Sequence, residues 1–447
     1  MNPTQYISLK EMGKERNTMN KFDVYNSSLL GESYYKTVHK SGLTVCVFPK
    51  DMSTTWGVLS VNFGGSITEY EKDGERIIIP QGCAHFLEHK LFDNPDGTNA
   101  DDIFSSLGAY CNAYTSSDKT AYLFSTTEKE EECLEHLIKF VTSPYFTEKT
   151  VQKEIGIIAE EIRGCIDDPY DRCYVGLLEG MYKNNPVKNE ICGSEESISR
   201  ITPEILYKCC DDFYVPSNMQ LCVSGKLSME KVLEIVDKVL ADKAESKPLI
   251  ANIYEPEDVV CPYVEKVMPV GKPIFSIGIK DVCIPSDSYE RFKRSEIINI
   301  LLNMMFSEAG EFYLDMLERD MISPGFDTGY SANAKTAHTM MSGECNDPRA
   351  LLAEIKKHIK KCIDGDLDER DFIREKRCLY ASYVSDFDLT EDIAFLLNGY
   401  AWENLDLFTY PGLIESISFD DVKRVAQEIF KDEYFTLSVV RPPENGE

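Results

Sequence analysis

Residues 85–89 read His-Phe-Leu-Glu-His, which places two imidazoles and one carboxylate within a short stretch of chain. Positions four apart share one face of a helix, so His85 and His89 can direct ring nitrogens at the same metal ion. Glu88 lies beside them, where its carboxylate can take a proton from water that the metal activates. We interpret this pentapeptide as a metal site with an adjacent general base.

The alternative is a helix whose two histidines are hydrogen-bonded inside a core. The chain contains only 6 histidines in 447 residues, so this spacing with an acid at the right place is uncommon by composition alone. Burying two imidazoles and a carboxylate on one helix face without partners would also cost free energy. These two points favour the metal site.

A catalytic zinc site takes three protein ligands and leaves one position open, so a third ligand must come from elsewhere in the chain. The acidic segment 148–163 offers candidates. Glu154 and Glu161 are two helical turns apart and share a face, whereas Glu160 is turned away from Glu161 by about 100°. Spacing alone does not choose among these acids, and such a face is most often only solvated.

The formal charge of the chain is −29 at pH 7. Such a surface repels nucleic acid and anionic membranes and attracts basic peptides; a well-solvated acidic surface is the simpler alternative. The 15 cysteines include no Cys-x-x-Cys pair, which favours reduced thiols over a disulfide scaffold. The first 30 residues carry no signal-like apolar core, and no apolar run approaches 18 residues. We expect a cytoplasmic protein without a membrane partner.

The length predicts two domains of about 200 residues. The expected fold class is α/β (α+β), with two similar mixed domains, each an antiparallel-rich sheet with helices packed on it. The predicted boundaries are an N-terminal extension (1–34), a first domain that bears the metal motif (35–241), a linker (242–258) and a second, homologous domain without the motif (259–447).

Local patterns predict the elements that position the motif. Residues 69–76 read as a charged loop before the motif helix. A helix at 291–306 takes the place of the motif helix in the second half but contains no histidine, which predicts one metal site per chain. Other predicted helices are 100–107, 128–141, 148–162, 173–182, 203–213, 228–241, 348–363, 369–387, 389–403 and 419–430, and predicted strands include 43–49, 57–63, 109–115, 120–126, 219–224, 273–279 and 435–440.

These residues resemble a known family. The motif at 85–89, Cys-Asn-Ala-Tyr-Thr at 111–115, the acidic helix at 154–162, Gly-Ser-Glu-Glu-Ser-Ile at 193–198 and Tyr-Val-Pro-Ser-Asn-Met at 214–219 follow one another as in the pitrilysin- or insulinase-type inverzincins. This M16 zinc metallopeptidase family includes insulin-degrading enzyme and the processing-peptidase subunits of mitochondria. The resemblance covers about residues 35–240 and is looser beyond.

The resemblance implies a role for several residues. By it, one Zn²⁺ per chain is held by His85, His89 and Glu161, with Glu154 as a supporting acid. The interval from His89 to Glu161 is a few residues shorter than is usual in the family, so Glu160 stays open as the third ligand. The family's peptide-binding edge strand maps onto Asn112, Ala113, Tyr114 and Thr115, which implies substrate binding by strand addition.

One departure from the family concerns the second half. Members that act alone tend to carry an Arg and a Tyr about seven residues apart that contact the substrate carbonyl. Here Glu318 stands at the expected Arg position, and Arg319 and Tyr330 are eleven apart. This implies a dimer, either of two like chains or of this chain and a homologous subunit.

The predicted activity is that of a zinc endopeptidase that cleaves unfolded peptides or leader sequences, with basic peptides a candidate class, inside a closed chamber. Glu88 and Glu154 are its predicted catalytic residues. The alternatives are a non-catalytic or partner-dependent subunit of a peptidase-like complex and a metal-dependent hydrolase that acts on another bond.

Overall fold

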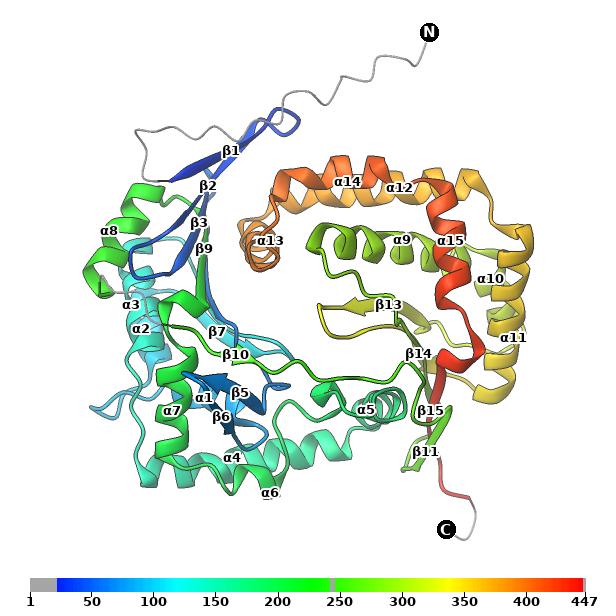
Figure 1. The fold of residues 1–447 in the computed structure, drawn as a ribbon, viewed down its shortest axis with the longest axis horizontal. Helices are drawn as coiled ribbons and strands as arrows, with labels where there is room; N and C mark the ends of the chain where they lie inside the picture. The colour runs from blue at the N-terminus through cyan, green and yellow to red at the C-terminus, as the bar shows by residue number, and fades with distance from the viewer. Residues whose placement is uncertain (1–21, 242–245, 445–447) are drawn as a thin grey trace.

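Two large sheets organise the computed structural model, which describes residues 22–241 and 246–444 (Figure 1). The five strands of the second sheet correspond in order to the last five strands of the first. The first sheet has the order β1-β2-β3-β9-β4-β8-β7 and the second has β11-β15-β12-β14-β13. In each sheet one pair is parallel, β3 with β9 and β11 with β15, and the other pairs are antiparallel. The predicted α/β (α+β) class with two similar, antiparallel-rich halves is therefore confirmed.

The strands are β1 (Asp23–Ser27), β2 (Glu32–Val38), β3 (Thr44–Pro49), β4 (Thr55–Val61), β5 (Glu69–Lys72), β6 (Glu75–Ile78), β7 (Tyr110–Thr115), β8 (Thr120–Thr126), β9 (Met219–Gly225), β10 (Leu249–Ile250), β11 (Tyr263–Val267), β12 (Ile274–Lys280), β13 (Asp327–Ala332), β14 (Ala337–Glu344) and β15 (Phe435–Arg441). The α-helices are α1 (Cys83–Lys90), α2 (Ala100–Leu107), α3 (Glu130–Thr142), α4 (Glu148–Asp167), α5 (Pro169–Met181), α6 (Glu195–Ile198), α7 (Pro203–Phe213), α8 (Met229–Val239), α9 (Ser288–Phe306), α10 (Glu311–Glu318), α11 (Pro348–Lys361), α12 (Glu369–Ser385), α13 (Thr390–Trp402), α14 (Tyr410–Ser416) and α15 (Phe419–Ile429).

The segment at 69–76 differs from its prediction as a charged loop. It forms a hairpin of β5 and β6, and β10 pairs with β5 on the other side. Asp73 and Gly74 both have positive φ, 53° and 81°, as a tight two-residue hairpin turn requires. Tyr70 is its apolar anchor, because that side chain is buried while most of its neighbours are charged.

Two further differences concern the predicted extension and linker. Residues 1–21 and 242–245 lie outside the described part of the chain, but β1 falls within the range predicted as an extension and pairs with β2. The predicted linker contributes β10 to the small sheet. Helices α6, α10 and α14 were not predicted; they are short, at 4, 8 and 7 residues. Among the described residues, no helix is both long and apolar enough to cross a membrane.

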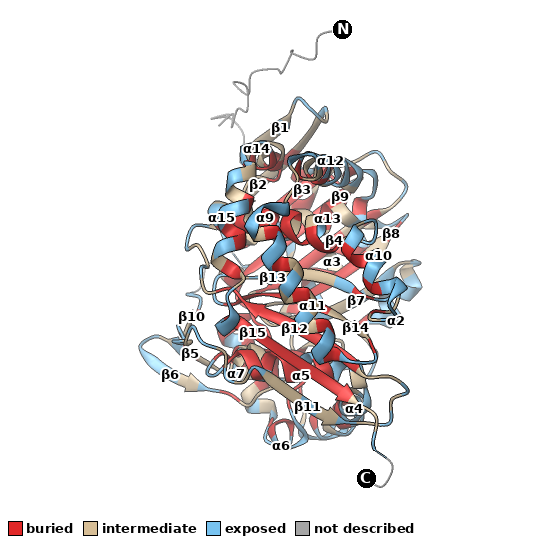
Figure 2. Cartoon of the chain, turned by 90° about the vertical axis from the view of Figure 1, so that its right-hand side faces the viewer, coloured by how far each residue is buried: buried red, intermediate tan, exposed pale blue. Residues whose placement is uncertain are grey.

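The two halves exchange one helix each. Helix α5, which precedes the linker, packs on β12 and β15 of the second sheet, and α13 packs on β4 and β9 of the first (Figure 1). Both strands under α5 are buried along nearly their whole length (Figure 2). The predicted helices at 173–182 and 389–403 are therefore present, but each covers the sheet of the opposite half.

Small residues permit this close packing of α5. A Cβ added at Gly176 would lie 2.7 Å from Oγ of Ser438, and one at Gly180 would lie 2.6 Å from Cγ2 of Thr436. On the other side, Ser60 of β4 donates to Asn398 of α13 at 2.9 Å. The exchanged helices thus join the halves through buried contacts rather than through the linker alone.

The exchange predicts the effect of a methyl group at Gly180. Gly180→Ala forces α5 away from Thr436, so we expect a loss of about 1–3 kcal/mol in the free energy of unfolding, measured by urea denaturation. Gly399→Ala is the matched control, because the space around Gly399 on α13 is open and alanine there stabilises the helix by about 0.5–1 kcal/mol. Equal effects of the two variants would contradict this packing.

Candidate metal centre

Helix α1 carries the motif, and its first turn is fixed by a glycine. Gly82 caps the helix with φ 92°, and a Cβ there would lie 2.5 Å from the carbonyl oxygen of Cys192. Only glycine suits both the left-handed conformation and this close approach. Phe86 and Leu87 are fully buried in the first core, so the packing face of α1 determines where its polar face points.

Helix α4 brings the second set of acids to α1. Its first turn is capped by Thr147, whose hydroxyl accepts the backbone N–H of Thr150. Ile158 and Ile162 pack into the same core as α1, and the two helices are in contact. The face that carries Glu154 and Glu161 therefore lies against the histidines.

Three side chains converge on one point. Nε2 of His85 lies 3.3 Å from Oε1 of Glu161, and Nε2 of His89 lies 3.6 Å from Oε2 of the same carboxylate. One ligand atom from each residue falls within 4.8 Å of the other two. Two imidazole nitrogens and one carboxylate oxygen are a donor set that suits zinc. No other group of three or more such ligands occurs in residues 22–241 and 246–444.

Glu154 orients one of the two imidazoles. Its Oε1 lies 3.0 Å from Nδ1 of His89, so the carboxylate accepts the Nδ1 proton and leaves the Nε2 lone pair facing Glu161. This is the arrangement that supports a metal-ligating histidine. Burial opposes protonation of His89, but the hydrogen bond and charge of Glu154, with the charges of Glu161 and Glu88, outweigh it and raise the pKa of His89.

The charge of Glu161 is supported in turn by the imidazoles. The hydrogen bond from His85 is the main cause that lowers the pKa of Glu161, and burial only partly opposes it. Glu160 points elsewhere: its side chain is 74% exposed and pairs with Arg163. Of the acids that spacing left open, the structure thus brings Glu161 and Glu154, and not Glu160, to the histidine pair.

Glu88 has a partner that sequence reasoning did not anticipate. Oγ1 of Thr115 donates to Oε2 of Glu88 at 2.6 Å. Thr115 is the last residue of β7, which ends the first sheet and pairs with β8 on one side only. The other edge of β7 is not paired with any strand of the described residues. This edge ends at Thr115, beside the predicted base Glu88. In the sequence, only the alternation of residues 110–115 indicates that the Thr115 side chain turns toward the core.

The remaining predicted strand residues alternate along this edge. Tyr110, Asn112 and Tyr114 are exposed, whereas Cys111 and Ala113 pack against the core. Asn112 bends its side chain back, so that its amide nitrogen donates to the hydroxyl of Tyr110 at 2.8 Å. The structure therefore places Asn112 and Tyr114 on one face of β7 and Ala113 and Thr115 on the other.

Arg319 and Tyr330 do not converge on a common point. Arg319 pairs with Asp315 at 3.0 Å and Glu354 at 3.3 Å. The hydroxyl of Tyr330 donates to Asp281 at 2.7 Å. The two residues are therefore engaged by different carboxylates of the second half.

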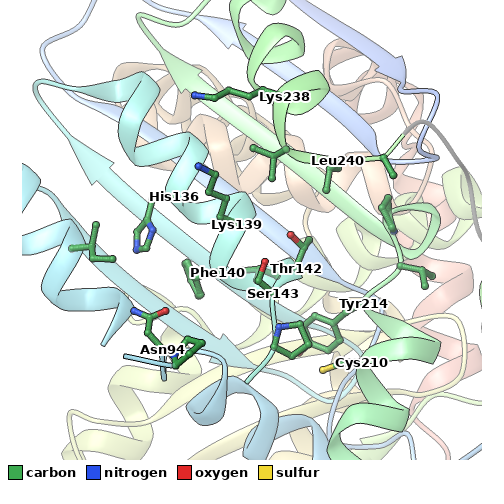
Figure 3. A pocket seen from close by; sticks show the side chains of 18 of the residues that line it. Asn94, His136, Lys139, Phe140, Thr142, Ser143, Cys210, Tyr214, Lys238 and Leu240 are labelled. Carbon is green, nitrogen blue, oxygen red and sulfur yellow. The ribbon is translucent and has the colours of Figure 1, made fainter. Parts of the chain in front are cut away.

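A groove of about 1110 Å³ lies apart from the metal residues, over α3, α7 and α8 (Figure 3). Several of its polar side chains have protein partners. His136 lies within hydrogen-bonding distance of the carbonyl of Ala100, and Lys139 and Lys238 both pair with Glu135. This groove contains none of the three convergent residues.

Comparisons with known proteins show the family to which the chain belongs. The family model described as Insulinase (Peptidase family M16) matches residues 70–195, and the one described as Peptidase M16 inactive domain matches residues 200–379. The uncharacterized zinc protease YmfH of Bacillus subtilis is 34% identical over 421 residues, 92% of this chain and 97% of that protein. The chain belongs to the M16 peptidase family.

Other members show the same fold and related names. The crystal structure of an M16-like peptidase from Alicyclobacillus acidocaldarius superposes with a TM-score of 0.89 at 28% identity and covers 94% of this chain and 100% of that one. A probable mitochondrial-processing peptidase subunit beta of Arabidopsis thaliana is 22% identical over 81% of this chain and 71% of its own length. The predicted family is thereby confirmed.

The geometry predicts different effects for adjacent acids. Glu161→Gln removes a charged ligand atom from the convergent set, so we expect zinc affinity to fall by more than about tenfold, measured by competition with a chromophoric chelator. Glu160→Gln is the matched control and should leave the affinity unchanged, because that side chain faces solvent and Arg163. A greater loss of zinc affinity in Glu160→Gln than in Glu161→Gln would assign the ligand to Glu160.

Proposed function

We propose that the chain is a zinc endopeptidase that cleaves unfolded peptides, with one Zn²⁺ held by His85, His89 and Glu161. The observation that carries this proposal is the convergence of three ligand atoms within 4.8 Å of one another. The carboxylate of Glu88, which is not one of these ligands, lies beside them. A zinc ion there would act as a Lewis acid that polarises a carbonyl and makes water more acidic. Membership of the M16 family supports the same reaction.

In the proposed mechanism, Glu88 transfers protons and Glu154 positions a metal ligand. Glu88 takes a proton from the attacking water and passes it to the leaving amine as the peptide bond breaks. Glu154 holds the Nδ1 proton of His89 and so directs Nε2 into the site. Glu154 therefore acts through His89, whereas Glu88 acts on the reacting atoms.

The free edge of β7 supports an extended peptide as the substrate. Backbone groups of residues 112–115 can pair with a peptide as an added strand, which gives affinity with little dependence on sequence. A closed chamber would exclude a folded domain, which favours unfolded peptides or leader sequences. The net charge of −29 favours basic ones.

An aromatic surface beside β7 offers contacts for substrate side chains. Trp56 lies 6.3 Å from Tyr110 and 6.2 Å from Phe395 between ring centroids, and Tyr114 lies 6.3 Å from Phe395. Phe395 comes from α13 of the second half, so both halves contribute to this surface. Aromatic faces bind apolar side chains without demanding one sequence.

The proposal extends to a partner and a compartment. The separate engagement of Arg319 and Tyr330 supports a dimer in which a second subunit, either a like chain or a homologue without the motif, closes the chamber over the peptide. All 15 cysteines are free, which is consistent with a reducing cytoplasm. A partner-dependent subunit is the second candidate, favoured by the match of residues 200–379 to an inactive-domain model.

The proposed reaction predicts a separation of binding from catalysis. Glu88→Gln keeps the shape of the site but cannot accept a proton, so we expect normal zinc content and a fall in kcat of about 10²–10⁴-fold, measured on fluorogenic leader-like peptides. Glu230→Gln, at an exposed position of α8, is the control.

Chelator separates the candidates in the same assay. Loss of cleavage on chelation and its return with zinc support the endopeptidase. Full activity of Glu88→Gln would refute the role of Glu88. Cleavage by the zinc-loaded chain only after a homologous subunit is added would establish the partner-dependent form.

A further inference from the structure

Thr115 joins two parts of the site that have separate tasks. It ends β7, the strand whose free edge suits an extended peptide, and its side chain reaches Glu88 on α1. We propose that Thr115 is a positioning residue that orients the Glu88 carboxylate and couples it to the peptide-binding strand. This inference rests on the proposed zinc endopeptidase function.

The direction of the hydrogen bonds follows from the proton count. A hydroxyl has one proton to donate. Thr120 lies opposite Thr115 in the β7–β8 pairing, and its buried hydroxyl donates to the carbonyl of Phe63 at 2.8 Å. Because Thr120 has spent its proton, the 3.3 Å contact between the two hydroxyls could be a hydrogen bond only if Thr115 donated it. The carboxylate of Glu88 is the stronger acceptor, since it is charged and closer, at 2.6 Å. Thr115 therefore gives its only proton to that carboxylate.

The backbone around Thr115 is held on the side away from the peptide edge. The turn that follows is closed by the N–H of Ser116, which donates to Lys119 at 2.8 Å. Two further bonds tie this turn to the loop after β4: Gly65 donates to Ser116 and Ser66 to Ser117, both at 2.9 Å. Threonine is also restricted at χ1 by its branched Cβ. The hydroxyl is thus presented from a fixed support.

A carboxylate needs such support to act as a base. Glu88 reaches the site through rotatable bonds, and a displacement of about 1 Å at a reacting group can cost on the order of a hundredfold in rate. A hydrogen bond to Oε2 removes that freedom and keeps the other oxygen for proton transfer. Because Thr115 shares β7 with Asn112 and Ala113, a peptide that pairs with this strand steadies the same support.

This role differs from direct substrate binding, which was the expectation for Thr115 from the family resemblance. If the hydroxyl bound substrate, its loss would raise KM. If it orients Glu88, its loss lowers kcat and leaves both KM and zinc binding unchanged. These two outcomes separate the alternatives in one kinetic experiment.

The test uses the full-length, zinc-loaded chain, with its partner subunit if activity needs one. Thr115→Val replaces the hydroxyl by a methyl group of similar size, and we expect kcat to fall by about ten- to a hundredfold with KM and zinc content unchanged. Thr115→Ser restores the donor and should recover most of the wild-type kcat. Thr328→Val, on the edge strand of the second sheet, controls for loss of a threonine hydroxyl from an edge strand.

Each result decides the proposal. A wild-type kcat in Thr115→Val, a rise in KM alone, or a loss of zinc from that variant would overturn it, as would failure of Thr115→Ser to recover activity when its melting temperature equals that of the wild type. Absence of chelator-sensitive cleavage by the wild-type protein, alone and with its partner, would instead reject the proposed function itself, and the inference with it.

Discussion

The hydrogen bond between Glu154 and His89 is the interaction on which the site depends. It joins α4 to α1 at 3.0 Å and selects the ring nitrogen of His89 that faces Glu161. Helix α1 has only 8 residues and could not hold its own orientation. Gly82 fixes its start against Cys192, buried aromatic and aliphatic residues fix its rotation, and Glu154 fixes its imidazole. A metal centre is possible because these three constraints act together.

The exchange of α5 and α13 makes the packing of each half depend on the other half. Each sheet is covered by a helix from the other half, so neither half completes its packing alone. One consequence reaches the site: Phe395 on α13 lies beside Tyr114 on β7, which makes the aromatic surface a product of both halves. The second half lacks a metal motif, yet it builds part of the aromatic surface beside β7.

Local signals in the sequence were enough for many elements. The helix at 100–107 has the predicted bounds because Asn99 caps its start and Gly108, in the left-handed conformation, ends it. The hairpin at 69–76 escaped prediction because charge dominates the segment and its one buried anchor, Tyr70, gives no period. The Asp73-Gly74 turn was the available signal. Amphipathic periodicity also predicts α5 and α13 as helices. It does not indicate which sheet each helix covers.

The residues of the site were likewise predictable from the sequence only in part. Helical spacing placed His85, Glu88 and His89 on one turn, and the family resemblance pointed to Glu161. Spacing alone could not separate Glu161 from Glu160, because the choice depends on how α4 is rotated against α1. The contact of Thr115 with Glu88 joins residues 27 positions apart and depends on how β7 packs against α1, which no local pattern encodes.

X-ray absorption at the zinc edge of the zinc-loaded protein would establish whether α1 and α4 form one zinc centre. We expect one zinc per chain in a shell of two imidazole nitrogens with the remaining ligands oxygen, and loss of that shell when His85 and His89 are replaced. A shell that contains thiolate sulfur, a shell of oxygen alone, or a protein that retains no zinc would contradict it.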